Sequence, residues 1–324
     1  MEYTTLGSTG MEVSKVCLGC MSFGSGDDWM LDEKEGRELV ERAIDLGVNF
    51  FDTANTYSSG ESEEILGDVL AHYDRDEQVV ATKVRFPGAS DHRNAVGLSR
   101  KTIEQELSHS LDRLGLDTVD LYQIHRWDPD TPIETTLRAL DDAVHRGQVR
   151  HIGASSMRAH QFQEALHVSD RENLARFETM QDLYHLTYRE EEREMYPVCE
   201  KEDIGVIPWS PLAAGYLARP HEQFSATTRG HYEAEEVEVP YHTGPGSREI
   251  NERVQELAAE KGVTMAQIAL AWHFENDDTD APIVGTSSIE HLEEAVEALS
   301  VSLSASDMAY LEEPYEPVAV FGHE

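Results

Sequence analysis

The sequence predicts a closed (β/α)8 barrel, the TIM-barrel fold of the α/β class, and three observations support this. Eight short, continuously apolar segments alternate with helical patterns, which is typical of a parallel sheet covered on both faces. The length of 324 residues suits one such barrel, so a single domain over 1–324 is expected. No G-x-G-x-x-G motif follows the first strand, which argues against a Rossmann fold.

A β-hairpin is expected first, with strands over 3–5 and 11–13 and a glycine turn over 7–10. The eight barrel strands are expected at 16–19, 48–52, 79–83, 119–125, 149–154, 177–181, 205–209 and 282–285. Helical patterns lie at 33–46, 63–72, 100–114, 133–146, 159–168, 189–201, 248–261, 264–274 and 289–299. Ser59 or Ser62 is expected to cap the second helix. A long irregular region, 218–247, follows the seventh strand, and we expect it on the catalytic rim.

The charge of the chain excludes two classes of partner. Its 63 acids and 26 bases give a formal net charge of -37, and such a field repels nucleic acid and anionic membranes. The acids are spread along the chain between regular apolar segments, which argues against disorder. Scattered acid with few lysines is typical of a halophilic protein, because concentrated salt shortens the screening length to about 3 Å at 1 M.

Neither a secretory signal nor a membrane span is expected. The N-terminal residues include no basic region and no apolar run, and no window approaches the 18 or so apolar residues of a span. A cytoplasmic location is therefore expected. Cys17 and Cys20 form a C-x-x-C, but no second cysteine pair and no histidine pair lies at zinc spacing. They are interpreted as small residues at the end of a core strand, and no metal site is predicted.

In a barrel of this kind the functional residues lie at the carboxyl ends of the strands. Those ends carry, in order, Asp52, Lys83, His125, Ser155, Gln181, Trp209 and Gly285. The first three end strands that are neighbours in the barrel wall, and Tyr57 lies on the loop after Asp52. Four ionisable groups are therefore expected to converge on one side of the mouth.

These four groups suit the reduction of a carbonyl. Tyrosine has an unperturbed pKa of about 10, and the nearby ammonium of Lys83 is expected to lower it. Asp52 would orient the lysine, while His125 could polarise or protonate a carbonyl. Tyr57 would supply the proton and another group the hydride. Each residue alone has an ordinary explanation, since Lys83 could pair with a surface acid and His125 could be a satisfied core histidine.

Runs on almost every strand resemble the aldo/keto reductase superfamily, in particular the aryl-alcohol-dehydrogenase-like reductases. The runs are 49–57, 81–84, 123–128, 153–156 and 208–212, and the resemblance covers nearly the whole chain. It implies a tetrad of Asp52, Tyr57, Lys83 and His125, with Tyr57 as general acid. It also implies a nicotinamide cofactor, NADP(H) with NAD(H) as the alternative, bound in an extended form across the barrel mouth.

The resemblance also implies which residues contact that cofactor. Ser155 and Gln181 would bind the carboxamide, and Trp209 would lie under the nicotinamide ring. The rest of the implied set is Ser156, Ser210, Leu212, Gly215, Gly285, Thr286, Ser287, Ser288, His291 and Glu294. Two positions depart from the family pattern. Ser156 stands where an asparagine is usual, and no Lys or Arg follows the last strand, which weakens the expected preference for NADPH.

The leading hypothesis is a reductase that converts an aromatic or otherwise apolar aldehyde or ketone into an alcohol with NADPH. Trp29, Trp127 and the 218–247 region would line the substrate pocket, although rim packing explains the tryptophans equally well. A second hypothesis is a cofactor-binding regulatory subunit of an ion channel, against which the intact tetrad weighs. A third is a lyase or isomerase with Lys83 as Schiff-base nucleophile, which borohydride trapping would reveal. Oligomeric state and physiological substrate are left open.

We expect the folded state to gain stability from salt. A net charge of -37 makes the fold repel itself in dilute buffer, and screening relieves that repulsion. Melting curves followed by circular dichroism in dilute and in molar potassium chloride measure the effect. A melting temperature indifferent to salt would contradict the halophilic interpretation.

Overall fold

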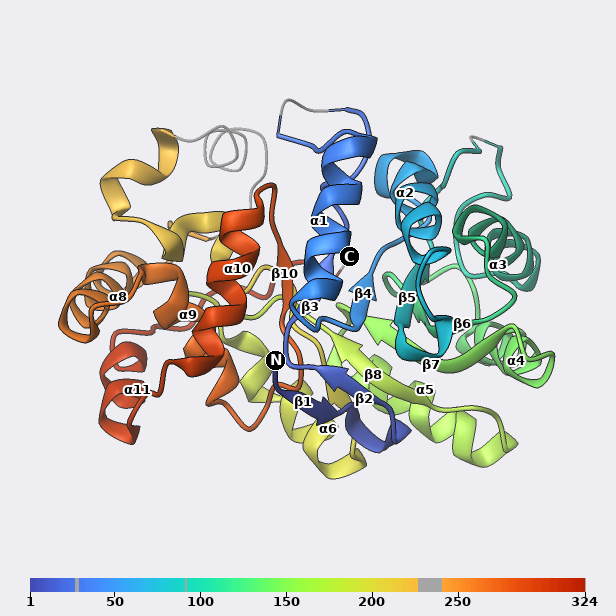
Figure 1. The fold of residues 1–324 in the computed structure, drawn as a ribbon. Helices are drawn as coiled ribbons and strands as arrows, with labels where there is room; N and C mark the ends of the chain where they lie inside the picture. The colour runs from blue at the N-terminus through green and yellow to red at the C-terminus, as the bar shows by residue number, and fades with distance from the viewer. Residues whose placement is uncertain (27–28, 91, 227–240, 324) are drawn as a thin grey trace.

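The barrel is confirmed by the computed structural model, which describes residues 1–26, 29–90, 92–226 and 241–323 (Figure 1). One parallel sheet contains, in spatial order, β10 (Ile283–Gly285), β3 (Cys17–Gly19), β4 (Phe50–Asp52), β5 (Val79–Val84), β6 (Val119–Ile124), β7 (Val149–Ser155), β8 (Phe177–Gln181) and β9 (Gly205–Val206). The sheet closes beyond β9, where Trp209 forms a parallel bridge with Ile283 and the Ile283 N–H donates to the Pro208 carbonyl at 2.8 Å.

Helices surround the sheet on its outer side (Figure 1). They are α1 (Glu33–Asp45), α2 (Glu61–Leu70), α3 (Arg100–Leu114), α4 (Ile133–His145), α5 (Ala159–Glu172), α6 (Met195–Glu202), α8 (Ser247–Lys261), α9 (Met265–Phe274), α10 (Ile289–Glu297) and α11 (Ala305–Glu312). Local chemistry sets several ends. Asp32 and Glu35 form a capping box at the start of α1, Ser99 caps α3, and left-handed Gly115 ends it.

The predicted hairpin, β1 (Tyr3–Thr5) and β2 (Glu12–Ser14), leads into a plug at the amino-terminal end of the barrel. Leu6 is fully buried in a cluster with side chains of the strands, including Cys17 and Phe50. The turn approaches the barrel so closely that a Cβ on Gly7 would lie 2.2 Å from the backbone nitrogen of Gly205. Only glycine fits there. Cys17 and Cys20 are both buried and unpaired thiols, as their interpretation as core residues requires.

Three local predictions are wrong. The helix predicted over 189–201 is interrupted: the 3-10 turn η4 (Glu190–Arg193) precedes α6, and Glu194, at φ -140°, breaks the helical path between them. Neither Ser59 nor Ser62 caps α2, because Gly60 is the N-cap and the Ser62 hydroxyl donates to the Cys20 carbonyl at 2.8 Å. The last helix, α11, was not predicted.

The region after the seventh strand is only partly irregular. It contains two short turns, η5 (Ala213–Ala218) and η6 (His221–Ala226), and α8 begins at its end with Ser247. Residues 227–240 lie outside the described ranges. Of the predicted region 218–247, η5 contains only the first residue, Ala218, and the structure places Ala218 and Arg219 at the wall of the cleft described below.

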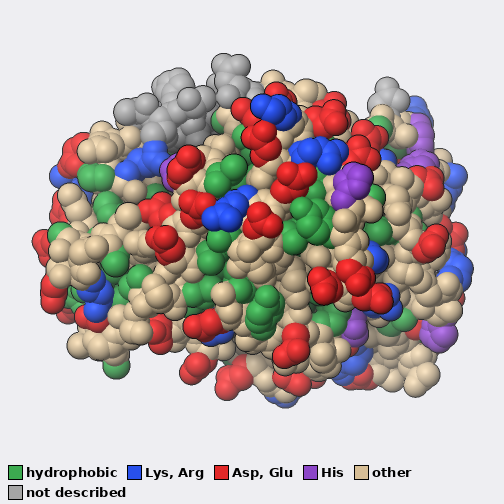
Figure 2. Space-filling model, viewed as in Figure 1, with side chains coloured by type: hydrophobic (Ala, Val, Ile, Leu, Met, Phe, Trp, Pro, Cys, Tyr) green, Lys and Arg blue, Asp and Glu red, His purple; other side chains and the backbone are tan. Residues whose placement is uncertain are grey.

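Acidic side chains are spread over the face of the molecule shown in Figure 2, with the basic ones scattered among them. Many of the bases form ion pairs between neighbouring helices, such as Arg42 with Glu293 and Arg253 with Glu313. None of the helices in the described ranges is both long enough and apolar enough to span a membrane.

Candidate active site

A cleft of about 430 Å³ opens at the carboxyl ends of the strands. Fifteen of the nineteen predicted site residues line it. Twelve of them are Asp52, Tyr57, His125, Ser155, Gln181, Trp209, Ser210, Leu212, Gly215, Gly285, Thr286 and Ser287. His291, Glu294 and Trp29 also line it. The four predicted residues outside the lining are Lys83, Ser156, Ser288 and Trp127. The strand-end argument therefore located the cleft.

The floor of the cleft is an ion pair between Lys83 and Asp52. The Lys83 ammonium donates to Asp52 Oδ1 at 2.5 Å and to the Thr53 carbonyl at 3.0 Å, and both charged side chains are almost completely buried. Two amides, Gln123 Nε2 and Gln181 Nε2, donate to Asp52 Oδ2 at 3.1 and 3.0 Å. The carboxylate thus has donors on both oxygens, which is the condition for a stable buried charge.

Tyr57 stands over this pair. Its hydroxyl lies 3.2 Å from Lys83 Nζ, and that ammonium is 4.8 Å from the centre of the tyrosine ring. The loop that presents it is held at both ends, because Ser58 Oγ donates to the Phe23 carbonyl at 2.7 Å and Asn55 Nδ2 donates to Glu106 at 2.9 Å. The position of Tyr57 is therefore fixed by contacts outside the cleft.

The pKa values in this group depart from the simple expectation. Burial raises the pKa of Tyr57, and the lowering effect of the Lys83 ammonium does not outweigh it. Burial alone would lower the pKa of Lys83, but the attraction of Asp52 and Tyr57 raises it. The lowering effect expected from Lys83 is present, but burial outweighs it and the pKa of Tyr57 is raised overall. Near neutral pH the tyrosine holds its proton and the lysine is charged.

His125 completes the predicted tetrad. Its ring meets the ring of Tyr57 edge-on, with centroids 5.8 Å apart, and also contacts Phe86 at 5.1 Å. Burial, together with the positive charges of Lys83 and Arg126, holds the pKa of His125 well below its ordinary value. Its Nδ1 is buried and has no hydrogen-bond partner within the described ranges. The imidazole is therefore neutral and polar at the wall of the cleft.

Ser155, Ser156 and Gln181 form a connected group beside the tetrad. Ser155 Oγ donates to the Gln181 carbonyl at 2.8 Å, while the Gln181 amide is held by Asp52 as described above. The indole N–H of Trp209 donates to Ser156 Oγ at 3.1 Å. Ser156 therefore holds the Trp209 ring in place by this hydrogen bond and does not itself line the cleft.

The far end of the cleft is built from the segment that follows β9, from η5, from β10 and from the start of α10. Ser210, Ala214 and Gly215 have left-handed backbone angles, which fold the chain tightly against the opening. A Cβ on Gly285 would meet no atom within 4 Å, so the end of β10 faces open space. Ser288 is the N-cap of α10 and accepts from the His291 N–H at 3.2 Å.

Two arginines in the lining were missed by the sequence analysis. Arg126, next to His125, lies with its guanidinium 6.0 Å from the Trp209 ring and donates to the His125 carbonyl at 2.6 Å. Arg219, just after η5, lines the cleft near Gly215, and its Nε has no partner within the described ranges. Arg126 lies within the run 123–128 of the family resemblance and Arg219 within the predicted 218–247 region, but neither was singled out as a site residue.

The two tryptophans predicted for the substrate pocket are placed differently. Trp29 lines the cleft. Trp127 is partly buried against the main hydrophobic core and is not among the lining residues. Rim packing is the better description of Trp127.

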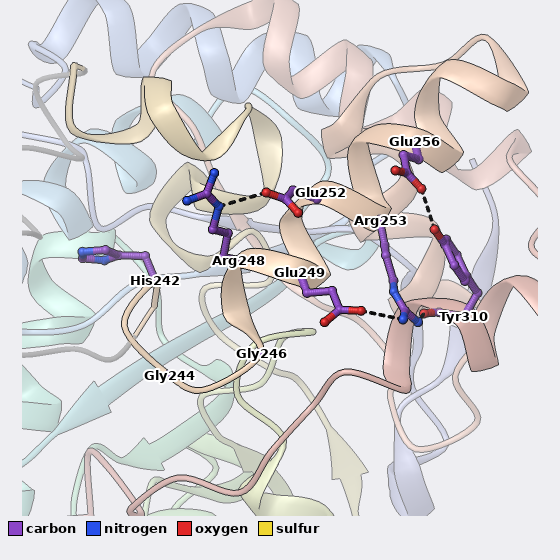
Figure 3. Close-up of a pocket in the computed structure, with 9 residues that line it drawn as sticks. All are labelled: His242, Gly244, Gly246, Arg248, Glu249, Glu252, Arg253, Glu256 and Tyr310. Carbon is purple, nitrogen blue, oxygen red and sulfur yellow. Dashed lines mark hydrogen bonds and ion pairs between the residues drawn. The ribbon is translucent and has the colours of Figure 1, made fainter.

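A second hollow, of about 610 Å³, lies on the outer surface over α8 and α11 (Figure 3). Its charged side chains satisfy one another: Arg248 pairs with Glu252, Arg253 with Glu249, and Tyr310 donates to Glu256. No strand end reaches it. The chemistry of the molecule is therefore concentrated at the barrel mouth.

Comparison with known proteins agrees with this geometry. The model of the aldo/keto reductase family matches residues 15–316. Versiconal hemiacetal acetate reductase of Aspergillus parasiticus is 40% identical over 99% of this chain and 98% of its own. A Schizosaccharomyces pombe protein with a provisional aryl-alcohol dehydrogenase name is 41% identical over 99% of this chain and 97% of its own. Aldo-keto reductase AFTS1 of Alternaria alternata is 40% identical over 99% of this chain and 93% of its own.

The buried ion pair predicts a strong dependence of stability on Lys83. Lys83→Met leaves Asp52 charged and unpaired in the barrel, and we expect it to lower the free energy of unfolding by about 3–5 kcal/mol. The double variant Asp52→Asn/Lys83→Met removes both charges and is expected to recover much of that loss. Chemical denaturation in molar potassium chloride measures both. Lys34→Met, which breaks an exposed pair with Glu38, is the control and should change stability by less than about 0.5 kcal/mol. A double variant as unstable as the sum of its single variants would contradict this account.

Proposed function

The chain belongs to the aldo/keto reductase family, and from that membership and the cleft geometry we propose that it reduces aromatic or otherwise apolar aldehydes and ketones with NADPH, Tyr57 donating the proton. One observation carries the proposal. A protonated tyrosine hydroxyl lies 3.2 Å from a buried ammonium, at the floor of a cleft that the other expected residues line. That is an arrangement for giving a proton to an oxygen that gains negative charge.

Each member of the tetrad has a separate task in this proposal. Asp52, held by Gln123 and Gln181, keeps Lys83 charged and in place. The ammonium of Lys83 stabilises the tyrosinate that forms as Tyr57 gives up its proton. The neutral imidazole of His125 binds and orients the substrate oxygen. The reacting oxygen would therefore meet donors from Tyr57 and His125 before its charge develops.

Arg126 adds to the positive electrostatic potential that Lys83 creates beside Tyr57 and His125. Its guanidinium lies beside His125 and no carboxylate of the described ranges lies within ion-pair distance of it. Its positive potential acts on both Tyr57 and His125 and favours negative charge in their vicinity. Trp29 supplies an aromatic wall to the same opening, which suits an apolar substrate.

The residues present also fit a dinucleotide. Trp209 offers a flat indole fixed by Ser156, and Ser210, Leu212 and Gly215 line the path away from it. The open backbone at Gly285 admits a group where a side chain would project. Beyond it Thr286, Ser287, Ser288 and His291 surround the N-terminus of α10, while Glu294 is placed to accept from hydroxyl or amino groups. When bound, the nicotinamide supplies the hydride that this chain's own side chains lack.

Replacing Tyr57 tests the proton-donor role. Tyr57→Phe removes the hydroxyl and keeps the ring, and we expect kcat for carbonyl reduction to fall by about 10²–10⁴-fold. NADPH binding, followed by quenching of tryptophan fluorescence, should be unchanged. Loss of NADPH absorbance with a panel of aromatic and aliphatic carbonyl compounds measures the rate. If the variant keeps a kcat within about threefold of the parent, Tyr57 is not the acid. An intact protein that binds NADPH and turns over no carbonyl compound would favour a regulatory role.

The second test concerns the choice of cofactor. Hydroxyls and the α10 N-terminus can hold a 2′-phosphate without an ion pair, so we expect NADPH to bind about ten- to thirtyfold more tightly than NADH. Arg219 is one of the two arginines that line the cleft, and Arg219→Gln should reduce binding of both cofactors if it contacts the pyrophosphate. If Arg219→Gln weakens the binding of NADPH and leaves the binding of NADH unchanged, the guanidinium contacts the 2′-phosphate. Arg248→Gln, outside the cleft, is the control. Tighter binding of NADH than NADPH in high salt would contradict the expected preference.

A further inference from the structure

A second group of ionisable side chains lies behind the cleft wall. Asp182 directly follows the last residue of β8, Glu191 belongs to η4, and His323 lies near the carboxyl end of the chain. A ligand atom from each lies within 4.8 Å of the other two, and His323 Nε2 is 2.9 Å from Glu191 Oε1. None of the three lines the cleft.

Asp182 is the unusual member of this group. Its side chain is fully buried, and neither carboxylate oxygen has a hydrogen-bond partner within the described ranges. The backbone N–H of Ser156 lies near the Asp182 carboxylate. It donates its hydrogen bond to the Gln181 carbonyl, at 3.1 Å. A buried carboxylate without donors is costly unless it is protonated or bound to a cation. The Asp182 carboxylate lies close to Glu191 and His323. A cation bound between the three side chains would therefore give its oxygens a partner.

His323 and Glu191 present the matching atoms. Burial lowers the pKa of His323, so its imidazole is neutral, and its Nδ1 has no partner within the described ranges. Burial raises the pKa of Glu191 to about 8. Burial likewise raises the pKa of Asp182 well above its ordinary value, although Arg126 contributes in the opposite direction. Arg126 acts on Asp182 from a distance, but it donates no hydrogen bond to either carboxylate oxygen.

We propose that Asp182, Glu191 and His323 bind one divalent transition-metal cation of the zinc or manganese class. Two carboxylates and one imidazole form a donor set that these ions accept. Ligand atoms about 2.1 Å from one ion lie about 3.4 Å apart in a tetrahedral site, so atoms that are now up to 4.8 Å apart must close by as much as about 1.4 Å. The imidazole–carboxylate separation of 2.9 Å already matches neighbouring ligands of one ion.

Such an ion would fasten the end of the chain to the barrel. The tail is held by the packing of Val318 and Phe321 against the core and by hydrogen bonds: the Phe321 N–H donates to the Tyr188 hydroxyl at 3.0 Å and the Val318 N–H donates to Glu190 at 2.9 Å. At Gly322 the tail passes beside the Trp209 ring, which a Cβ there would approach to 3.7 Å. The role of the ion is structural, and the site stands whether or not the proposed reductase activity is correct.

Titration calorimetry of the full chain tests the site. After dialysis against a chelator, Zn²⁺ and Mn²⁺ are titrated in molar potassium chloride, which screens weak binding to the acidic surface. We expect one ion per chain. Affinity should rise from pH 6 to pH 8 because Glu191 must lose its proton to bind, and buffers of different ionisation enthalpy should show proton release.

Variants separate this site from the acidic surface. Asp182→Asn keeps the shape of the side chain, and His323→Ala lies in the tail, where the barrel core is not disturbed. Each is expected to weaken Zn²⁺ binding at least about tenfold. Glu194→Gln, an exposed acid beside η4 and outside the group, is the matched control and should bind as the parent does. Absence of a one-to-one site, or unchanged binding by Asp182→Asn, would overturn the proposal. A melting temperature that Asp182→Asn raises and Zn²⁺ leaves unchanged would show that the group holds protons instead.

Discussion

Burial of the Lys83 ammonium is the constraint on which the rest of the barrel mouth depends. An ammonium at full burial persists only if a charge and further acceptors compensate for its lost hydration, and Asp52 with the Thr53 carbonyl does so. Asp52 in turn requires donors on its second oxygen, which come from β6 and β8. Four strands are thereby joined by one polar network. The network fixes the ammonium, and the contacts of Ser58 and Asn55 fix Tyr57 above it.

The barrel mouth contains several cations, although the molecule as a whole is strongly acidic. The chain has a formal net charge of -37, yet Lys83, Arg85 and Arg126 surround His125 and Arg219 lies farther along the cleft. At short range inside a poorly solvated cleft these cations dominate, because salt and water screen the distant acids. An acidic protein can therefore offer individual cations to a cofactor phosphate or to a carbonyl oxygen. Concentrated salt strengthens this contrast, since it weakens the surface field first.

The features that were predicted correctly from the sequence are those that repeat at regular spacing, namely the strands and the residues at their ends. Apolar runs gave all eight barrel strands, and their last residues gave Asp52, Lys83 and His125, because parallel strands end on one face. Features that depend on tertiary contacts were missed. Gly60 replaces the expected serine cap because Ser62 is drawn into the core, and Glu194 breaks a helix that amphipathic spacing favoured. Arg126 and Arg219 carry no periodic signal, so only the folded cleft shows where they point.

The group formed by Asp182, Glu191 and His323 shows the same limit more sharply, because 141 positions separate its first and last members. Metal-ligand spacing can be recognised only when ligands are close in sequence, as in the C-x-x-C of Cys17 and Cys20, which is buried and holds free thiols. Side chains of consecutive strand residues point to opposite sides. Gln181 therefore reaches inward to Asp52, while Asp182, one residue later, reaches the tail at His323. The end of β8 thus connects the catalytic network with the fastening of the chain terminus, and whatever compensates the charge of Asp182 also steadies the wall that carries Gln181 and Trp209.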